Sequence, residues 1–193
     1  MGGPELCTLR LYPTSVPAPE TFDDREVAER ILPCDMSLTA FASLVLPFGF
    51  INGLRTLVPV ASLCWGAHFH WFSFGQTPFA FLANPISLGV FSALAVGELI
   101  GDKLPKTPAR IAAFPLAGRT VFGAGCGAAL ATLAGVSPVL GGALGGLGAV
   151  VGAYAGFLLR RSLTKNAGLP DLPVALVEDA IAIGGACFIA SRF

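Results

Sequence analysis

Two carboxylates stand at the end of an apolar segment in the stretch "GELIGDKLPKTPAR", which runs from Gly97 to Arg110. Glu98 and Asp102 are four residues apart, so a helix places them on one face, where like charges repel. A carboxylate in the last turn of a helix also opposes the helix dipole. Because both local effects are unfavourable, we expect cations from other segments, a bound cation or protons to compensate these two groups.

Other apolar segments also contain charged residues. A charge at the centre of a bilayer costs at least ~2.5–3.5 kcal/mol on insertion scales, so such residues are expected to face one another inside a helix bundle. At ~1.5 Å per residue from the nearest segment end, their depths overlap. The predicted intramembrane polar cluster consists of Arg55, Glu98, Asp102, Arg119, Glu178 and Asp179.

Glu178 and Asp179 are adjacent, so on a helix they project about 100° apart and cannot both face one partner. Glu178 shares a face with the small residues Ala182 and Gly185, and we therefore predict that Glu178 points inward. Such a cluster has two interpretations. One is a pathway or site for protons, ions or a small solute, and the other is a set of salt bridges that only holds helices together.

The elements that carry these residues are membrane helices, as the composition shows. The 193 residues are 54% hydrophobic and only 12% charged, whereas soluble domains carry about 25% charged residues. No basic patch with interleaved aromatic residues is present, which excludes nucleic acid as a partner.

The apolar segments predict an all-α, polytopic transmembrane helix bundle of about five spans within residues 36–193. The first segment, residues 37–67, exceeds the ~20 residues that a span needs. It contains Pro47 and Gly49, so we expect a kinked or broken helix. The other segments cover residues 85–104, 111–135, 138–160 and 171–191. Residues 1–35 are polar and acidic and are predicted to be a disordered tail, which an over-extended start-site assignment would explain.

The orientation is predicted from the charges of the links between spans. Two links are basic and the other two contain no Lys or Arg, and short basic links stay cytoplasmic. With five spans, the N-terminus is then expected inside and the C-terminus outside. The residues of the basic links are Lys103, Lys106, Arg110, Arg160, Arg161 and Lys165.

Small residues line one face of the fourth segment, in "GGALGGLGAVVGAYAG". Their spacing of three or four residues predicts close packing of helix backbones, the pattern called a glycine zipper. The residues are Gly141, Gly145, Gly148, Gly152 and Gly156.

No pattern in the sequence indicates an enzyme, a cofactor or a metal. His68 and His70 lie near Cys64, but no carboxylate is close in sequence, and an aromatic loop at the membrane interface explains residues 68–84 better than a metal site.

Four stretches, "GLRTLVPVA", "GELIGDKLPKTPAR", "GAYAGFLLRR" and "LVEDAIAIGG", resemble the bacterial membrane proteins grouped as domain of unknown function 4126. The resemblance covers about residues 36–193, and its most specific part is the pattern E-x3-DK-x-P followed later by ED. It implies a multi-pass protein of the bacterial inner membrane. The matching positions are Arg55, Glu98, Asp102, Lys103, Pro105, Glu178 and Asp179.

The family implies no activity, so two functions remain open. The first is a small transporter or channel whose polar cluster handles an ion or small solute. The alternative is a structural or assembly protein whose buried ion pairs hold the helices together. The lipid bilayer is the expected partner, and self-association is left open by the sequence.

Overall fold

A computed structural model describes residues 36–75, 77–102, 113–166 and 170–193. The predicted tail, residues 1–35, lies outside these ranges. So do Lys103, Lys106 and Arg110, and the side chain of Lys165 is likewise outside the description. The predictions made for these residues therefore stay predictions.

The described residues form helices and no strands, as the sequence predicts. Asn84 caps one helix, since its side-chain oxygen accepts from the Ile86 amide at 2.9 Å and Pro85 follows at the first helical position. In chain order the elements are α2 (Leu38–Leu54), α3 (Leu57–His68), the 3-10 turn η1 (Ala80–Ala83), α4 (Pro85–Gly101), α5 (Ala113–Leu133), α6 (Pro138–Arg161), the π turn η2 (Ser162–Asn166) and α7 (Asp171–Ala190).

Three helices, α5, α6 and α7, are long and apolar enough to cross a membrane. Helices α2, α3 and α4 are also apolar but have only 17, 12 and 17 residues. At ~1.5 Å per residue, α3 is ~18 Å long and cannot cross a hydrocarbon core of ~30 Å alone.

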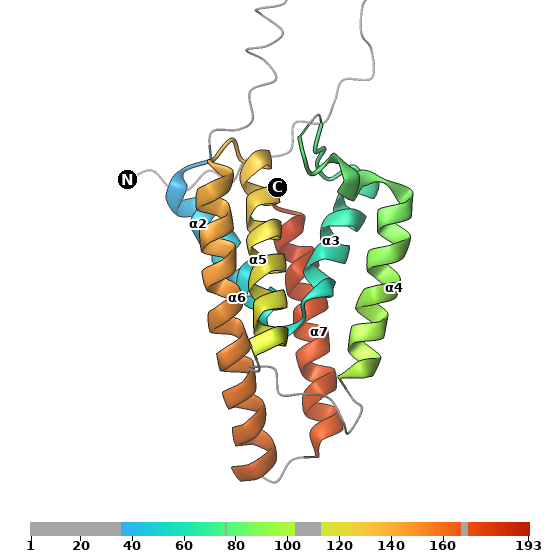
Figure 1. Cartoon of the computed structure of the whole chain (residues 1–193), viewed down its shortest axis with the longest axis vertical. Helices are drawn as coiled ribbons and strands as arrows, with labels where there is room; N and C mark the ends of the chain where they lie inside the picture. Colours follow the sequence, from blue (N-terminus) through green and yellow to red (C-terminus); the bar gives the residue numbers. More distant parts are fainter. Residues whose placement is uncertain (1–35, 76, 103–112, 167–169) are drawn as a thin grey trace, which may run out of the picture. The chain divides into compact units, whose positions relative to one another are not determined.

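The first apolar segment is broken, one of the two expected forms, and its two helices form a hairpin instead of one span. Helix α2 continues through Pro47, and the chain leaves helical geometry at Arg55. Contacts of Gly49 with Gly145 and of Gly53 with Gly152 show that α2 runs parallel to α6. Helix α3 then returns toward the end of the bundle where α2 began, as Figure 1 shows. The expectation that residues 37–67 cross the bundle in one direction is therefore wrong.

The two ends of the bundle carry different elements (Figure 1). At one end, which we call the Phe193 end, the Phe41 and Phe193 rings meet edge to face at 6.5 Å, so α2 begins where α7 finishes. The opposite end, the Arg160 end, carries the last turns of α4 and α6 and the first turns of α5 and α7. The first described residues and the last therefore lie at the same end of the bundle, while the predicted orientation of the two termini in the membrane stays a prediction.

Helix α6 packs between α2 and α5 through glycines. A Cβ at Gly145 would overlap the carbonyl oxygen of Gly123 in α5, and a Cβ at Gly152 would overlap that of Phe50 in α2. Gly141 and Gly148 make similar backbone contacts with α5 and α2, respectively. Close approach of backbones lets dispersion contacts replace the hydrophobic effect, which is absent between helices in lipid.

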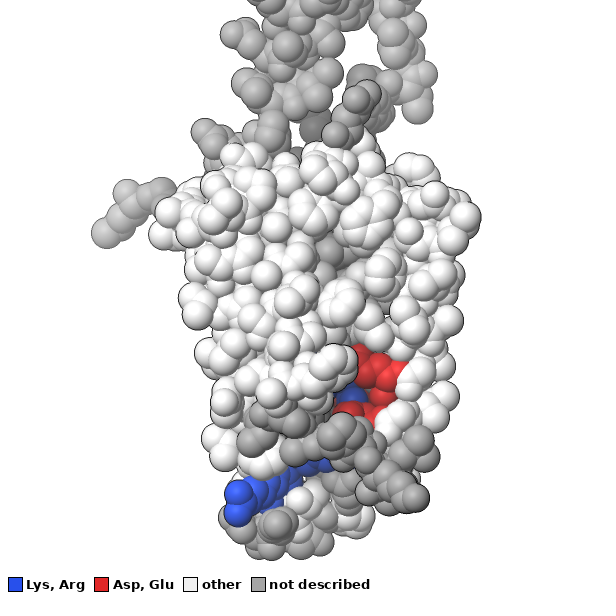
Figure 2. All heavy atoms as spheres, in the orientation of Figure 1, with Lys and Arg blue, Asp and Glu red and all other residues white. Residues whose placement is uncertain are grey.

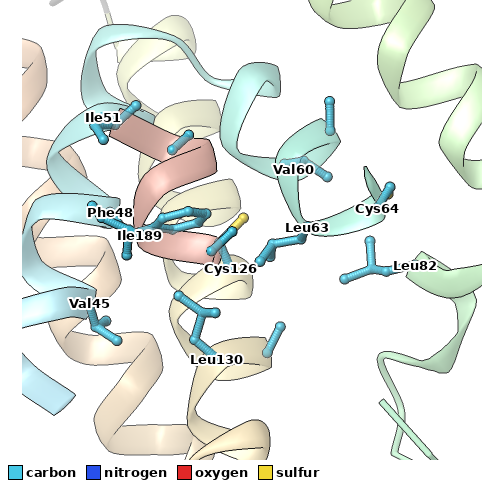
Figure 3. Close-up of a cluster of buried hydrophobic side chains, with 14 of the residues drawn as sticks. Val45, Phe48, Ile51, Val60, Leu63, Cys64, Leu82, Cys126, Leu130 and Ile189 are labelled. Atoms are coloured by element: carbon cyan, nitrogen blue, oxygen red, sulfur yellow. The ribbon is translucent and has the colours of Figure 1, made fainter. Parts of the chain in front are cut away.

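The core joins both arms of the hairpin to α5 and α7. Figure 3 shows Phe48 of α2, Leu63 of α3 and Leu130 of α5 in one cluster, and all three side chains are buried. The loop between α3 and α4 contributes to this core, since Phe72, Phe74 and Leu82 are buried. Residues 68–84 were expected to lie on a membrane interface, but part of this loop packs into the core.

Candidate functional site at the apex of the hairpin

Helix ends that are buried in protein need partners for their backbone groups, and the hairpin apex has two such ends. At the end of α2, the carbonyl oxygens of Gly53 and Leu54 both accept from Nη1 of Arg119, at 2.5 and 2.8 Å. Arg119 lies in α5 and is 5% exposed. A cation at the C-terminus of a helix also interacts favourably with the helix dipole.

The start of α3 is held by a carboxylate. The two oxygens of Glu98, in α4, accept from the backbone amides of Thr56 and Leu57 at 2.7 and 2.8 Å. Negative charge at a helix N-terminus is favourable for the same electrostatic reason. Glu98 thus opposes the dipole of its own helix, as its position in the sequence indicates, but is compensated by α3.

Arg55 occupies the apex itself and is fully buried. Its Nη1 donates to Oδ2 of Asp102, and its Nη2 lies 2.5 Å from Oδ1 of Asp179. Asp102 and Asp179 side chains are only 10% and 9% exposed. Arg160 of α6 approaches the same Asp102 oxygen at 3.7 Å. Two carboxylates from α4 and α7 therefore converge on one buried guanidinium.

Asp179, and not Glu178, is the inward carboxylate of α7. Asp179 is 6% exposed and pairs with Arg55, whereas Glu178 lines a groove beside Arg160. The prediction for Glu178 was wrong because it weighed the small residues of one helix face and not the position of the hairpin. Arg55 lies between α4 and α7, a placement that the sequence alone does not show.

The structure brings together Arg55, Asp102 and Asp179 in one ion-pair cluster and places Glu98 and Arg119 at the two helix ends beside it. We call these five residues the apex layer. Asp179 is eight residues from the start of α7, so it lies ~12 Å from the Arg160 end. Figure 2 shows acidic side chains at the surface of one face, with a basic group beside them.

The reversal of the chain was missed, although a signal for it exists. The stretch "NGLRT" contains the dipeptide Asn52-Gly53, which is typical of turns. In an apolar segment long enough for one span, this dipeptide does not by itself predict a reversal. Gly53 is needed at the apex for close packing, because a Cβ there would overlap the Ala149 carbonyl oxygen.

The histidines lie elsewhere. The ring of His68 packs against those of Trp65 and Phe69, and Phe69 stacks on Trp71 at 6.0 Å. This aromatic group is at the Phe193 end, far along α3 from the apex.

Comparison with known proteins identifies the family. The family described as "Domain of unknown function (DUF4126)" matches residues 43–191, most of the chain. The chain belongs to this family. The matched range contains every residue of the apex layer. No curated protein and no solved structure matches the chain.

Proposed function

We propose that this DUF4126 protein is a small transporter or channel of the bacterial inner membrane, and that the apex layer is its site for a proton, cation or small solute. Helices α4 to α7 cross the membrane in this proposal, and α2 and α3 enter it as a hairpin from one side. This arrangement replaces the five spans that the sequence indicates.

One observation carries the proposal: two half-helices meet inside the bundle at a buried arginine surrounded by carboxylates. Interrupted backbone at membrane depth is tolerated only inside protein or along a water-filled cavity, and it is common at the binding sites of transporters and channels. Ionisable residues at this depth are costly and typically functional.

Asp102 is the best residue to test, because it lies at the end of α4 and links Arg55 with Arg160. The full chain is reconstituted in liposomes, and proton and cation fluxes are measured with enclosed dyes. We expect flux above that of protein-free liposomes, reduced about tenfold or more in Asp102→Asn, which corresponds to ~1.4 kcal/mol or more on the barrier. Ser162→Ala, at the same end of the bundle, serves as the control.

A structural role is the second candidate, because Arg55 is fully buried and its two carboxylate partners are about nine-tenths buried. That role predicts no flux for the wild-type chain, whereas loss of the ion pair with Arg55 lowers the melting temperature of Asp102→Asn under either role. Wild-type flux above that of protein-free liposomes, reduced in an Asp102→Asn sample that is still folded at the assay temperature, would exclude a purely structural role.

A further inference from the structure

An apolar groove with two opposite charges lies outside the apex layer. It has a volume of about 710 Å³ and is formed by α6 and α7, with Phe50 and Leu54 of α2 as its back wall. Ala155 and Gly156 of α6 leave the space open because their side chains are too small to fill it. Sites of this size for amphiphilic ligands are typically apolar with a few polar groups.

The groove opens to the surface of the bundle. Leu159 of α6 and Val177 and Ile181 of α7 line it, and these side chains are about 60% exposed: 61%, 60% and 59%, respectively. In a membrane protein, such side chains face lipid. The groove is therefore accessible from the bilayer.

Arg160 and Glu178 face the groove from α6 and α7, respectively. Apolar residues lie on both sides of this charged level, with Ala155 and Ile181 toward the Phe193 end and Leu163 toward the Arg160 end. A ligand that fits needs an anionic group, a cationic group next to it and an apolar chain.

We propose that the groove binds a phospholipid with a zwitterionic amine headgroup, phosphatidylethanolamine in chemical class. Its phosphate contacts Arg160, its ammonium contacts Glu178, and one acyl chain lies along Phe50, Ala155 and Ile181. Basic pockets between membrane helices on the cytoplasmic side commonly bind headgroups. Because Nη1 of Arg160 is also 3.7 Å from Oδ2 of Asp102, a phosphate bound to Arg160 would lie next to the apex layer.

The inference rests on the proposed placement in the membrane but not on transport, so its test measures bound lipid and not flux. The full chain is reconstituted in vesicles of phosphatidylethanolamine, phosphatidylglycerol and phosphatidylcholine in equal parts. It is then extracted in mild detergent, and retained lipid is measured by native mass spectrometry. We expect retained phosphatidylethanolamine in excess of both other lipids.

Two variants form a matched pair. Ala155→Trp fills the groove and should lower the retained lipid about tenfold, whereas Leu158→Trp, at an exposed position of α6 that does not line the groove, should leave it unchanged. Glu178→Gln should remove the preference for phosphatidylethanolamine over phosphatidylglycerol. Equal retention in both tryptophan variants, or a preference of the wild type for phosphatidylglycerol, would overturn the proposal.

A second measurement uses only the wild type, in case Ala155→Trp fails to fold. Phosphatidylethanolamine with a photoreactive acyl chain should label residues 155–163 and 173–181 more strongly than the exposed α5 surface around Val121. Equal labelling of all exposed helix surfaces by this lipid would indicate ordinary contact with the bilayer and would contradict a lipid site in the groove. A dimer that retains no phosphatidylethanolamine in the native mass spectra would point to a second copy in the groove and would overturn the proposal.

Discussion

Arg55 shows how one side chain stabilises a chain reversal inside an apolar bundle. It is fully buried and contacts carboxylates from two helices that are distant in sequence, Asp102 and Asp179. A buried ion pair is a weak source of net stability, because desolvation offsets attraction, but breaking one is strongly unfavourable. The apex layer is therefore most sensitive to substitutions that remove one charge and leave its partner.

Arg55→Ala should lower the free energy of unfolding by ~3–5 kcal/mol, because Asp102 and Asp179 lose the guanidinium between them. Thermal unfolding in detergent measures the loss. Arg192→Ala is the matched control, since Arg192 is exposed and lies over the Phe188 ring at 4.4 Å. Its loss should be below ~1 kcal/mol. Adding Asp179→Ala to Arg55→Ala should recover part of the stability, because one unpaired carboxylate is removed. Equal losses of stability in Arg55→Ala and Arg192→Ala would contradict the ion-pair assignment.

Glu98→Ala should expose the amides of Thr56 and Leu57, because the two hydrogen bonds that hold them disappear. Loss of a charged acceptor for buried donors costs about 1.5–3 kcal/mol. Amide hydrogen exchange at residues 56 and 57 should accelerate, while exchange in the middle of α6 stays the same. Unchanged protection of these two amides would show that Glu98 does not cap α3 in the membrane.

The glycines of α6 determine how closely α2, the first arm of the hairpin, packs against α6. Gly152 faces the carbonyl oxygen of Phe50 in α2, whereas Gly184 of α7 has open space where its Cβ would be. Replacement of glycine by alanine should therefore have different effects on stability at these two positions.

Gly152→Ala should destabilise the chain by about 1–3 kcal/mol, because the new methyl group forces α2 and α6 apart. Gly184→Ala should be neutral or stabilise it by up to ~1 kcal/mol, because alanine loses less backbone entropy in a helix. Melting temperatures in one detergent compare the two variants. A stabilising Gly152→Ala would show that the α2–α6 contact is looser than described.

The sequence predicted most helices because local signals determine them. Asn84-Pro85 and Ser137-Pro138 mark two helix starts, and α4, α6 and α7 begin and end within three residues of the predicted segments. The hairpin was not predicted, because a reversal inside an apolar segment depends on tertiary partners. Arg119 and Glu98 hold the two helix ends at the apex, and they are more than 40 residues away in sequence.

Which charged residues would be buried was easier to predict than their pairing. Charge in an apolar segment is costly at any rotation, so Arg55 and Arg119 had to turn inward. Pairing depends on helix rotation, and a shift of one residue rotates a side chain by about 100°. That rotation distinguishes Asp179 at the apex from Glu178 in the groove.

For the whole molecule, the hairpin changes the sidedness of the chain. Helix α2 begins at the Phe193 end, where α7 also finishes. Arg160 and Arg161 are at the opposite end, where α4 also ends. The basic link with Lys103, Lys106 and Arg110 follows α4 in the sequence. Since short basic links stay cytoplasmic, we expect the Phe193 end to face away from the cytoplasm. The start of α2 and the end of α7 should then both be outside.

Single cysteines in a chain without native cysteines test this sidedness. We expect an impermeant thiol reagent added outside to label Thr39→Cys, Ser73→Cys and Ser191→Cys, because all three exposed positions belong to the Phe193 end. Ser162→Cys, at the Arg160 end, should react only after the membrane is opened. Labelling of Ser191→Cys but not of Thr39→Cys would mean that residues 37–67 cross the membrane as one span and that the hairpin does not form there. Outside labelling of Ser162→Cys alone would keep the hairpin but reverse its direction of entry, because the Arg160 end would then face outward.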